Sequence, residues 1–219
     1  MCYNVGMNRA PFDNDECYHI YNRGVDKRNI VMSGYDLDRF LKSMEFFNDI
    51  DPIVSLYSLS FEEQSTRKKR KPLVDILVYC INPNHYHMIL RQIVNGGISE
   101  FMKRLNGGYT RYFNHRYKRS GALLQGRFKS KYIGSEEYLL RVSAYVNLNN
   151  RVHQLSGSTT KLVRSSWQEY ADQVSGLCDT SFILKQFQNS SYKDYALEAL
   201  PQMIRDKILN KELASMLID

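Results

Sequence analysis

The chain has 219 residues, enough for one full domain or for a domain with an appendage. A hydrophobic content of 43% with 12% aromatics is typical of a globular protein. No apolar run reaches membrane-spanning length, and the first residues lack the charged and apolar regions of a signal peptide. These features exclude a membrane protein and favour a cytoplasmic one.

The chain has 30 Lys and Arg residues and 23 Asp and Glu residues, which gives a net charge of +7. This surplus suits a polyanionic partner such as nucleic acid, because bound phosphates release counterions. The four cysteines are scattered and form no CxxC pair, so we expect reduced thiols rather than a zinc knuckle or a disulfide framework. They are Cys2, Cys17, Cys80 and Cys178.

Periodicity and turn residues predict four strands and three helices in the first two thirds of the chain. The strands are expected at 17–24, 72–81, 85–93 and within 120–134. The helices are expected at 33–49, 98–119 and 135–150, the last capped by Ser135. In chain order these elements follow the split βαβ pattern of a ferredoxin-like α+β domain with an antiparallel sheet.

The predicted domain covers residues 1–154, and residues 155–219 read as a helical appendage. An insertion at about 58–72 carries the run RKKRK, which is more typical of a solvated loop than of a binding site. Gly107 and Gly108 weaken the middle of the 98–119 helix, where they would allow either a kink or a close approach to DNA.

His85 and His87 stand two positions apart in a strand, so their imidazoles point to the same face of the sheet. A histidine on an apolar face is often a core residue, but two adjacent rings can also share one cation. Two ligands are too few for a catalytic ion, so a third must come from elsewhere in the chain.

Tyr145 and Asn149 are four residues apart and would be neighbours on one face of the 135–150 helix. Alone, Tyr145 reads as a core aromatic. Together with a cation on His85, His87 and Asn149, its hydroxyl would form a nucleophilic site directed at a phosphodiester. We expect Mg²⁺ or Mn²⁺ from this chemistry, although two histidine ligands would also bind other first-row metals tightly.

These residues resemble the single-tyrosine HUH transposases, most closely the REP-associated tyrosine transposase branch. The resemblance is carried by YHIYNRGVDKR (18–28), YCINPNHYHMIL (79–90), LLQGRFKSKYI (123–133) and YVNLN (145–149). It implies a bacterial, nucleoid-associated, metal-dependent endonuclease for DNA transposition and recombination. Such an enzyme binds hairpin-forming single-stranded DNA and cleaves and rejoins one strand through a 5′-phosphotyrosine.

By this resemblance His85, His87 and Asn149 are the metal ligands and Tyr145 is the catalytic nucleophile. The family often continues from the asparagine with Pro-Val-Arg-Ala-Gly, whereas this chain reads NNRVHQL. Without the proline, we expect the helix to run further before turning.

Basic residues beside the predicted site are candidates for contacts with the DNA backbone. Those on the strand after Gly126 alternate onto one face, and others lie on the 98–119 helix or follow the first strand. The candidates are Arg23, Lys27, Lys103, Arg104, Arg111, Arg127, Lys129 and Lys131.

Three alternatives remain open at this level. A replication initiator or relaxase shares the H-x-H and tyrosine chemistry, a non-cleaving module would bind hairpins on the same fold, and a structural metal site would do neither. A homodimer is also open. Among the other histidines we expect His19 to be structural and both His115 and His153 to be exposed.

Overall fold

The computed structural model describes residues 11–51, 71–188 and 190–216, with side chains described through residue 209. Its centre is a five-stranded antiparallel sheet with the strand order β4-β1-β3-β2-β5. The strands are β1 (Cys17–Arg23), β2 (Val74–Ile81), β3 (His85–Gln92), β4 (Lys129–Ile133) and β5 (Arg164–Ser165).

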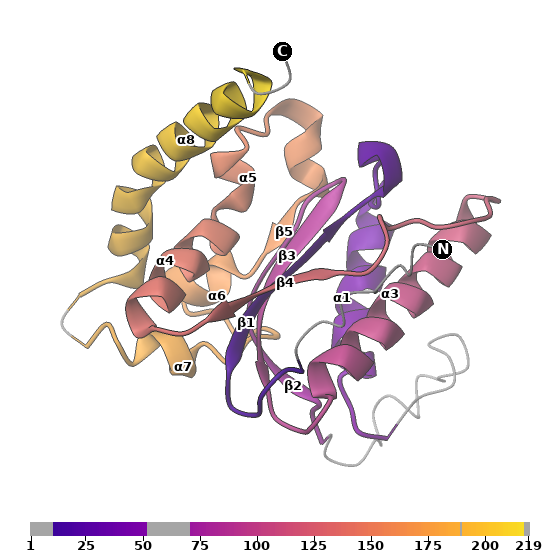
Figure 1. The fold of residues 1–219 in the computed structure, drawn as a ribbon, viewed down its shortest axis with the longest axis horizontal. Helices are drawn as coiled ribbons and strands as arrows, with labels where there is room; N and C mark the ends of the chain where they lie inside the picture. The colour runs from indigo at the N-terminus through magenta and orange to yellow at the C-terminus, as the bar shows by residue number, and fades with distance from the viewer. Residues whose placement is uncertain (1–10, 52–70, 189, 217–219) are drawn as a thin grey trace, which may run out of the picture.

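The predicted α+β ferredoxin-like fold is confirmed, because the first four strands adopt the order 4-1-3-2 with two helices between them. Helices α1 (Gly34–Phe47) and α3 (Gly97–Arg116) cover one face of the sheet (Figure 1). A short 3-10 helix, η1 (Val25–Lys27), joins β1 to α1.

A buried carboxylate ties α1 to α3. Asp36 accepts hydrogen bonds from the backbone N–H of Ser33 at 2.9 Å and from the Tyr112 and Tyr117 hydroxyls at 2.8 and 2.7 Å. The first bond belongs to a capping box with Ser33 that starts α1. Because a buried carboxylate is costly unless it is paired, these bonds fix how the two helices face each other.

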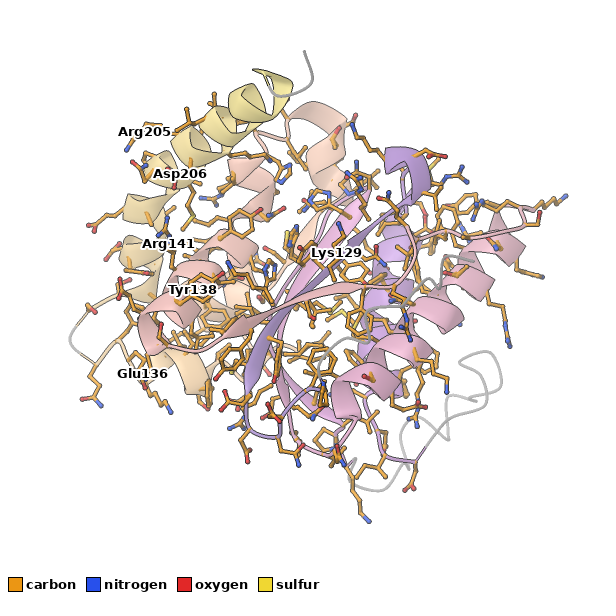
Figure 2. All side chains as sticks on the ribbon, viewed as in Figure 1. Lys129, Glu136, Tyr138, Arg141, Arg205 and Asp206 are labelled. Carbon is orange, nitrogen blue, oxygen red and sulfur yellow. The ribbon has the colours of Figure 1, made fainter. Side chains whose placement is uncertain are left out.

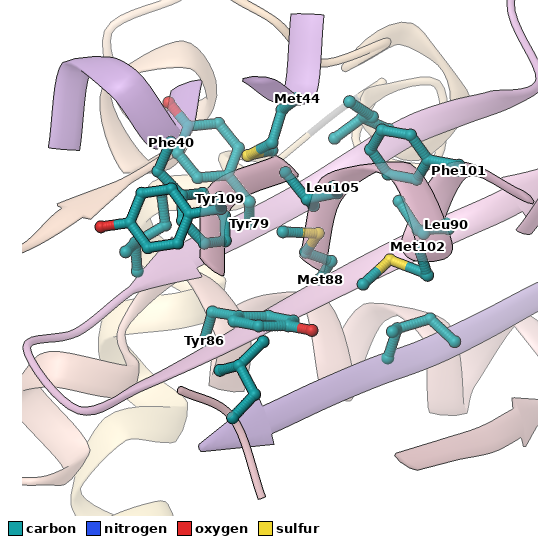
Figure 3. Packing of buried hydrophobic residues seen from close by; sticks show 14 of the residues in the cluster. Phe40, Met44, Tyr79, Tyr86, Met88, Leu90, Phe101, Met102, Leu105 and Tyr109 are labelled. Atoms are coloured by element: carbon teal, nitrogen blue, oxygen red, sulfur yellow. The ribbon is translucent and has the colours of Figure 1, made fainter. Parts of the chain in front are cut away.

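The core between the sheet and these helices is rich in aromatic and methionine side chains (Figure 3). Phe40 packs edge-on against Tyr109, with ring centroids 4.7 Å apart, and lies 5.5 Å from the Tyr86 ring. Tyr86, the residue between the two histidines, therefore points into this core and its neighbours point to the opposite face.

The opposite face of the sheet is covered by α4 (Glu136–Asn147) and by the C-terminal segment. Ser135 caps α4 as expected, since its side chain accepts from the Tyr138 N–H. The following elements are α5 (Asn149–Val152), η2 (Gly157–Leu162), α6 (Trp167–Ala171), α7 (Ser181–Leu184) and α8 (Tyr192–Met216). Residues 155–219 are thus mainly helical where they are described, but they also supply β5, which the sequence did not predict.

The C-terminal segment is joined to α4 by polar as well as apolar contacts. Buried Asn147 donates to the Tyr192 hydroxyl at 2.8 Å and accepts from Ser166 at 2.7 Å. On the surface, Arg141 of α4 forms an ion pair with Asp206 of α8 at 3.4 Å, in the space between the two helices in Figure 2.

Two local expectations have definite outcomes. Helix α3 is continuous through Gly107 and Gly108, and a Cβ atom at Gly108 would lie 2.6 Å from the Phe47 ring. Gly108 therefore serves the close packing of α1 on α3 rather than a kink. The RKKRK run in the predicted 58–72 insertion falls outside the described residues. No helix in the described part of the chain is both long and apolar enough to cross a membrane.

Candidate functional site

A pocket of about 400 Å³ lies at the end of the sheet where β1 ends and β3 begins. Its wall combines residues from β1, β3, β4 and α4 with the segments after β2 and α5. The lining includes Tyr21, Arg23, Lys27, Asn84, His85, His87, Gln125, Lys129, Tyr145 and His153.

His85 and His87 point to the same face, as the strand period predicts. Their ring centroids are 5.3 Å apart and the rings are nearly perpendicular, at 88°. Pairing of β1 with β3 places Arg23 opposite His85 and Tyr21 opposite His87. The hairpin between β2 and β3 positions His85, because the His85 carbonyl accepts from the Asn82 N–H at 2.8 Å.

Tyr145 comes from α4 and lies beside the histidines. Its ring is perpendicular to that of His87, at 87° with centroids 5.8 Å apart, and its side chain is half-buried. Burial raises the pKa of Tyr145, while the nearby Asn149 amide opposes that rise. The hydroxyl is therefore protonated at neutral pH and needs activation to act as a nucleophile.

Asn149 is completely buried, and its Oδ1 lies 3.0 Å from His85 Nε2. It does not continue α4 as the sequence suggested. Helix α4 ends at Asn147, Leu148 departs from helical geometry at φ −101° and ψ 14°, and Asn149 begins the separate α5. Although no proline follows Asn149, α4 is not longer than expected. The chain instead forms a turn at Leu148 and one short helix, α5.

The donor set of His85, His87 and Asn149 fits a divalent cation. His85 Nδ1 lies 2.6 Å from Asn84 Oδ1, and His87 Nδ1 lies 2.8 Å from His19 Nε2. Holding Nδ1 in this way is how proteins present Nε2 to a metal. Within the described residues, no three His, Cys, Asp or Glu side chains are grouped to hold an ion, so this set depends on the asparagine.

The pocket keeps its imidazoles neutral. Burial lowers the pKa of His87 well below its usual value, and the neighbouring His19 and His85 lower it further. Burial also lowers the pKa of His85 and brings the pKa values of His19 and His153 to about 4. Neutral rings are the form that can bind a metal.

The predicted basic residues divide into two groups. Arg23, Lys27 and Lys129 line the pocket. Lys131 follows on the same strand, 5.0 Å above the Tyr138 ring, and Arg127 is exposed just before β4.

The other three candidates belong to α3, which covers the sheet face opposite to α4 (Figure 1), whereas His87 lies beside Tyr145 of α4. Lys103 pairs with Glu100 at 3.4 Å, and Arg104 binds both Glu100 and the Asp49 carbonyl. Arg111 is exposed on the same helix. The structure therefore does not bring Lys103, Arg104 and Arg111 to the pocket.

The sequence analysis missed several residues that line the pocket or lie near it. His153 was expected to be exposed, but it is half-buried, with its ring 4.8 Å from that of His85. Its spacing of four from Asn149 was the available signal. Tyr21 stacks on His87 at 5.6 Å, and its alternation with His19 in β1 matches that of His85 and His87. Lys207 of α8, whose charge lowers the pKa of His85, His87 and His153, had no local signal.

Comparison with known families agrees with this geometry. Residues 57–149 match the family model described as transposase IS200 like. The match confirms the resemblance to this family that was inferred from the sequence.

One similar solved structure is described as the REP-associated tyrosine transposase bound to a REP hairpin. It is 12% identical, with a TM-score of 0.47, and the alignment covers 76% of this chain and 85% of that chain. No curated protein sequence matches the chain.

Proposed function

We propose that this protein is a divalent-metal-dependent endonuclease and strand transferase that acts on hairpin-forming single-stranded DNA. The observation that carries the proposal is the position of Tyr145, perpendicular to His87 and on the wall of the same pocket as His85. The family match of residues 57–149 supports the same chemistry.

In the proposed reaction the Tyr145 oxygen attacks the phosphorus of one phosphodiester. An O–P bond to tyrosine forms, the P–O3′ bond breaks, and the leaving oxygen takes up a proton to become a 3′-hydroxyl. The phenol loses its own proton in the same step. Attack by a 3′-hydroxyl on the phosphotyrosine then forms a new P–O3′ bond, breaks the tyrosine O–P bond and returns a proton to the phenol. Mg²⁺ or Mn²⁺, held by His85, His87 and Asn149, would supply Lewis-acid stabilisation of the phosphate charge.

The chain's own residues have distinct tasks in this proposal. Asn84 and His19 orient the two imidazoles through their Nδ1 atoms. Arg23, Lys27 and Lys129 give the pocket wall a positive charge that suits a DNA backbone. Tyr145 lies close to the ligands, so that attack needs no large movement of α4.

The test uses a labelled hairpin oligonucleotide with a single-stranded flank, incubated with the protein and Mn²⁺ and run on a denaturing gel. We expect a covalent adduct with the native chain and none with Tyr145→Phe, because only the nucleophilic oxygen is removed. Tyr21→Phe is the matched control, since Tyr21 lines the same pocket next to His87 and should leave the adduct intact.

His87→Ala should lose the adduct yet retain most hairpin affinity in a gel-shift assay, because phosphate contacts dominate affinity. An adduct that persists in Tyr145→Phe and disappears in Tyr21→Phe would move the nucleophile to β1. Hairpin binding without any adduct in the native chain would favour the non-cleaving module.

A further inference from the structure

A second asparagine, Asn82, is built into the candidate metal site. It follows β2 in the Asn-Pro-Asn turn and is completely buried. Its Nδ2 lies 3.0 Å from His85 Nε2 and 2.8 Å from Asn149 Oδ1. Neither the sequence motifs nor the family match assigned a role to this residue.

The tautomer of His85 is set by its other neighbour. Asn84 Nδ2 donates to the Lys27 carbonyl at 3.3 Å, which leaves Asn84 Oδ1 to accept from His85 Nδ1–H. His85 Nε2 therefore carries a lone pair. It lies 3.0 Å from Asn149 Oδ1, which is also a hydrogen-bond acceptor. Two acceptors at this distance repel each other unless a hydrogen-bond donor or a cation lies between them.

In the structure, the side-chain amide N–H groups of Asn82 are the donors to these two acceptors. This arrangement leaves two buried atoms, Asn82 Oδ1 and Asn149 Nδ2, without a hydrogen-bond partner among the described residues. An unpaired buried polar atom is costly, and amide oxygen and nitrogen occupy nearly equivalent positions. Turning the Asn82 amide by half a turn would place its oxygen beside His85 and Asn149.

The distances suit an octahedral ion. Adjacent ligands bound at 2.0–2.1 Å are separated by roughly 2.8–3.0 Å, which is the edge of the octahedron. The three separations among the Asn82 amide, His85 Nε2 and Asn149 Oδ1 are 2.8, 3.0 and 3.0 Å. The rotated amide could therefore complete one triangular face without movement of the backbone.

The backbone around Asn82 is also held firmly. Its N–H donates to the His85 carbonyl, and the next carbonyl, that of Pro83, accepts from Ile30 and Val31 at 2.6 and 3.0 Å. Burial raises the pKa of the nearby Cys80 thiol to about 12, and the Asn82 amide, which contacts this sulfur, opposes that rise.

We infer that Asn82 is a further ligand of the divalent cation, binding through Oδ1 after rotation of its amide. This inference rests on the proposed metal-dependent function and adds a second amide oxygen to its ligand set. In the metal-free protein the same amide acts as the stand-in donor between His85 and Asn149. The Asn82 side chain thus donates hydrogen bonds in the metal-free site and binds the cation in the metal-bound site.

The test is Mn²⁺ binding by the full-length protein, measured by the electron paramagnetic resonance signal of free Mn²⁺, with no DNA present. We expect Asn82→Ala to weaken binding by about tenfold or more. We expect Asn82→Asp to strengthen it, because a carboxylate oxygen would replace the amide oxygen. Metal-free Asn82→Asp should melt at a lower temperature than the native chain and should gain more from added Mn²⁺.

Asn82→Asp separates a ligand from a positioning donor. If Asn82 only donated hydrogen bonds to His85 and Asn149, the carboxylate would repel both atoms and weaken Mn²⁺ binding. That result, or native affinity in Asn82→Ala, would overturn the inference while leaving the proposed function intact. Absence of Mn²⁺ binding in the native chain would overturn both, and His87→Ala provides the reference for a lost ligand.

Discussion

Three imidazoles, those of His85, His87 and His153, line the pocket, and a fourth, that of His19, contacts His87 from behind it. Lys131 of β4 acts on His19, and Lys207 of α8 acts on the other three. Burial is the largest cause of the lowered pKa in every case, because desolvation penalises the charged ring. The positive charge that would exclude protons from these rings is also suited to attract a phosphate.

This cluster predicts acid sensitivity of the metal-free protein. Well above the unfolded pKa of about 6.5, the rings are neutral in both the folded and the unfolded chain, so they contribute no pH dependence. As the pH falls from about 6.5 towards about 4, the unfolded chain binds protons that the folded chain excludes at His19 and His153. The free energy of unfolding should therefore fall across this window.

Urea denaturation at several pH values with a chelator present will measure this effect. His19→Gln should flatten the dependence between pH 6.5 and 4, because one of the shifted groups is gone. His153→Gln, at the second histidine whose pKa is lowered to about 4, should flatten the dependence in the same way. Equal slopes in all three chains would contradict the role of burial.

At the scale of elements, α1 and α3 pack closely because a glycine lies where they meet. Gly108 faces the Phe47 ring, whereas a Cβ atom added at its neighbour Gly107 would meet no atom within 4 Å. The two glycines share a helix and differ only in what they face. They therefore offer a matched pair for measuring how much of the fold depends on this contact.

We predict opposite effects for the two alanine substitutions. Gly107→Ala should raise the free energy of unfolding by about 0.5–1 kcal/mol, because alanine is the better helix former. Gly108→Ala should lower it by about 1–3 kcal/mol, since its Cβ would overlap the Phe47 ring. Chemical denaturation checks both, and partial recovery in Gly108→Ala with Phe47→Leu would identify the overlap as the cause.

At the scale of the molecule, the C-terminal segment completes the second core and reaches the site. Tyr170, Tyr192 and Met203 join residues of β2, β3 and α4 in one apolar cluster. The same segment contributes Lys207 near the histidines. Because it covers a sheet face that would otherwise expose apolar side chains, we expect the proposed catalytic domain, 1–154, to depend on residues after 155.

Tyr192→Phe removes one hydroxyl of the C-terminal segment and so tests whether the catalytic domain depends on this segment. Its hydroxyl accepts from Asn147 at 2.8 Å and donates to Ser143 at 3.2 Å, in a buried network. Removing it leaves the buried Asn147 N–H donor without this partner, so the free energy of unfolding should fall by about 1–3 kcal/mol. Tyr195→Phe is the control, since its hydroxyl has no hydrogen bond with any described residue. Equal losses in both variants would refute a specific role for the network.

The sequence alone determined the order of the elements up to α4 and the local faces of each. Strand alternation put His85 and His87 on one side and Tyr86 on the other, and helical periodicity identified α1, α3 and α4. These are short-range properties, because the repeats of 2 residues in a strand and 3.6 residues in a helix can be recognised from residues close together in the sequence. The resemblance to single-tyrosine transposases relied on the same local blocks.

Only the tertiary structure decided which distant residues meet. The register of β1 on β3 brought His19 and Tyr21 to His87, and the turn after β2 placed Asn82 against Asn149. The tertiary structure also keeps Lys103, Arg104 and Arg111 away from the pocket, because α3 covers the other face of the sheet. Such contacts depend on strand pairing and on the packing of layers, and no periodicity along the chain records them.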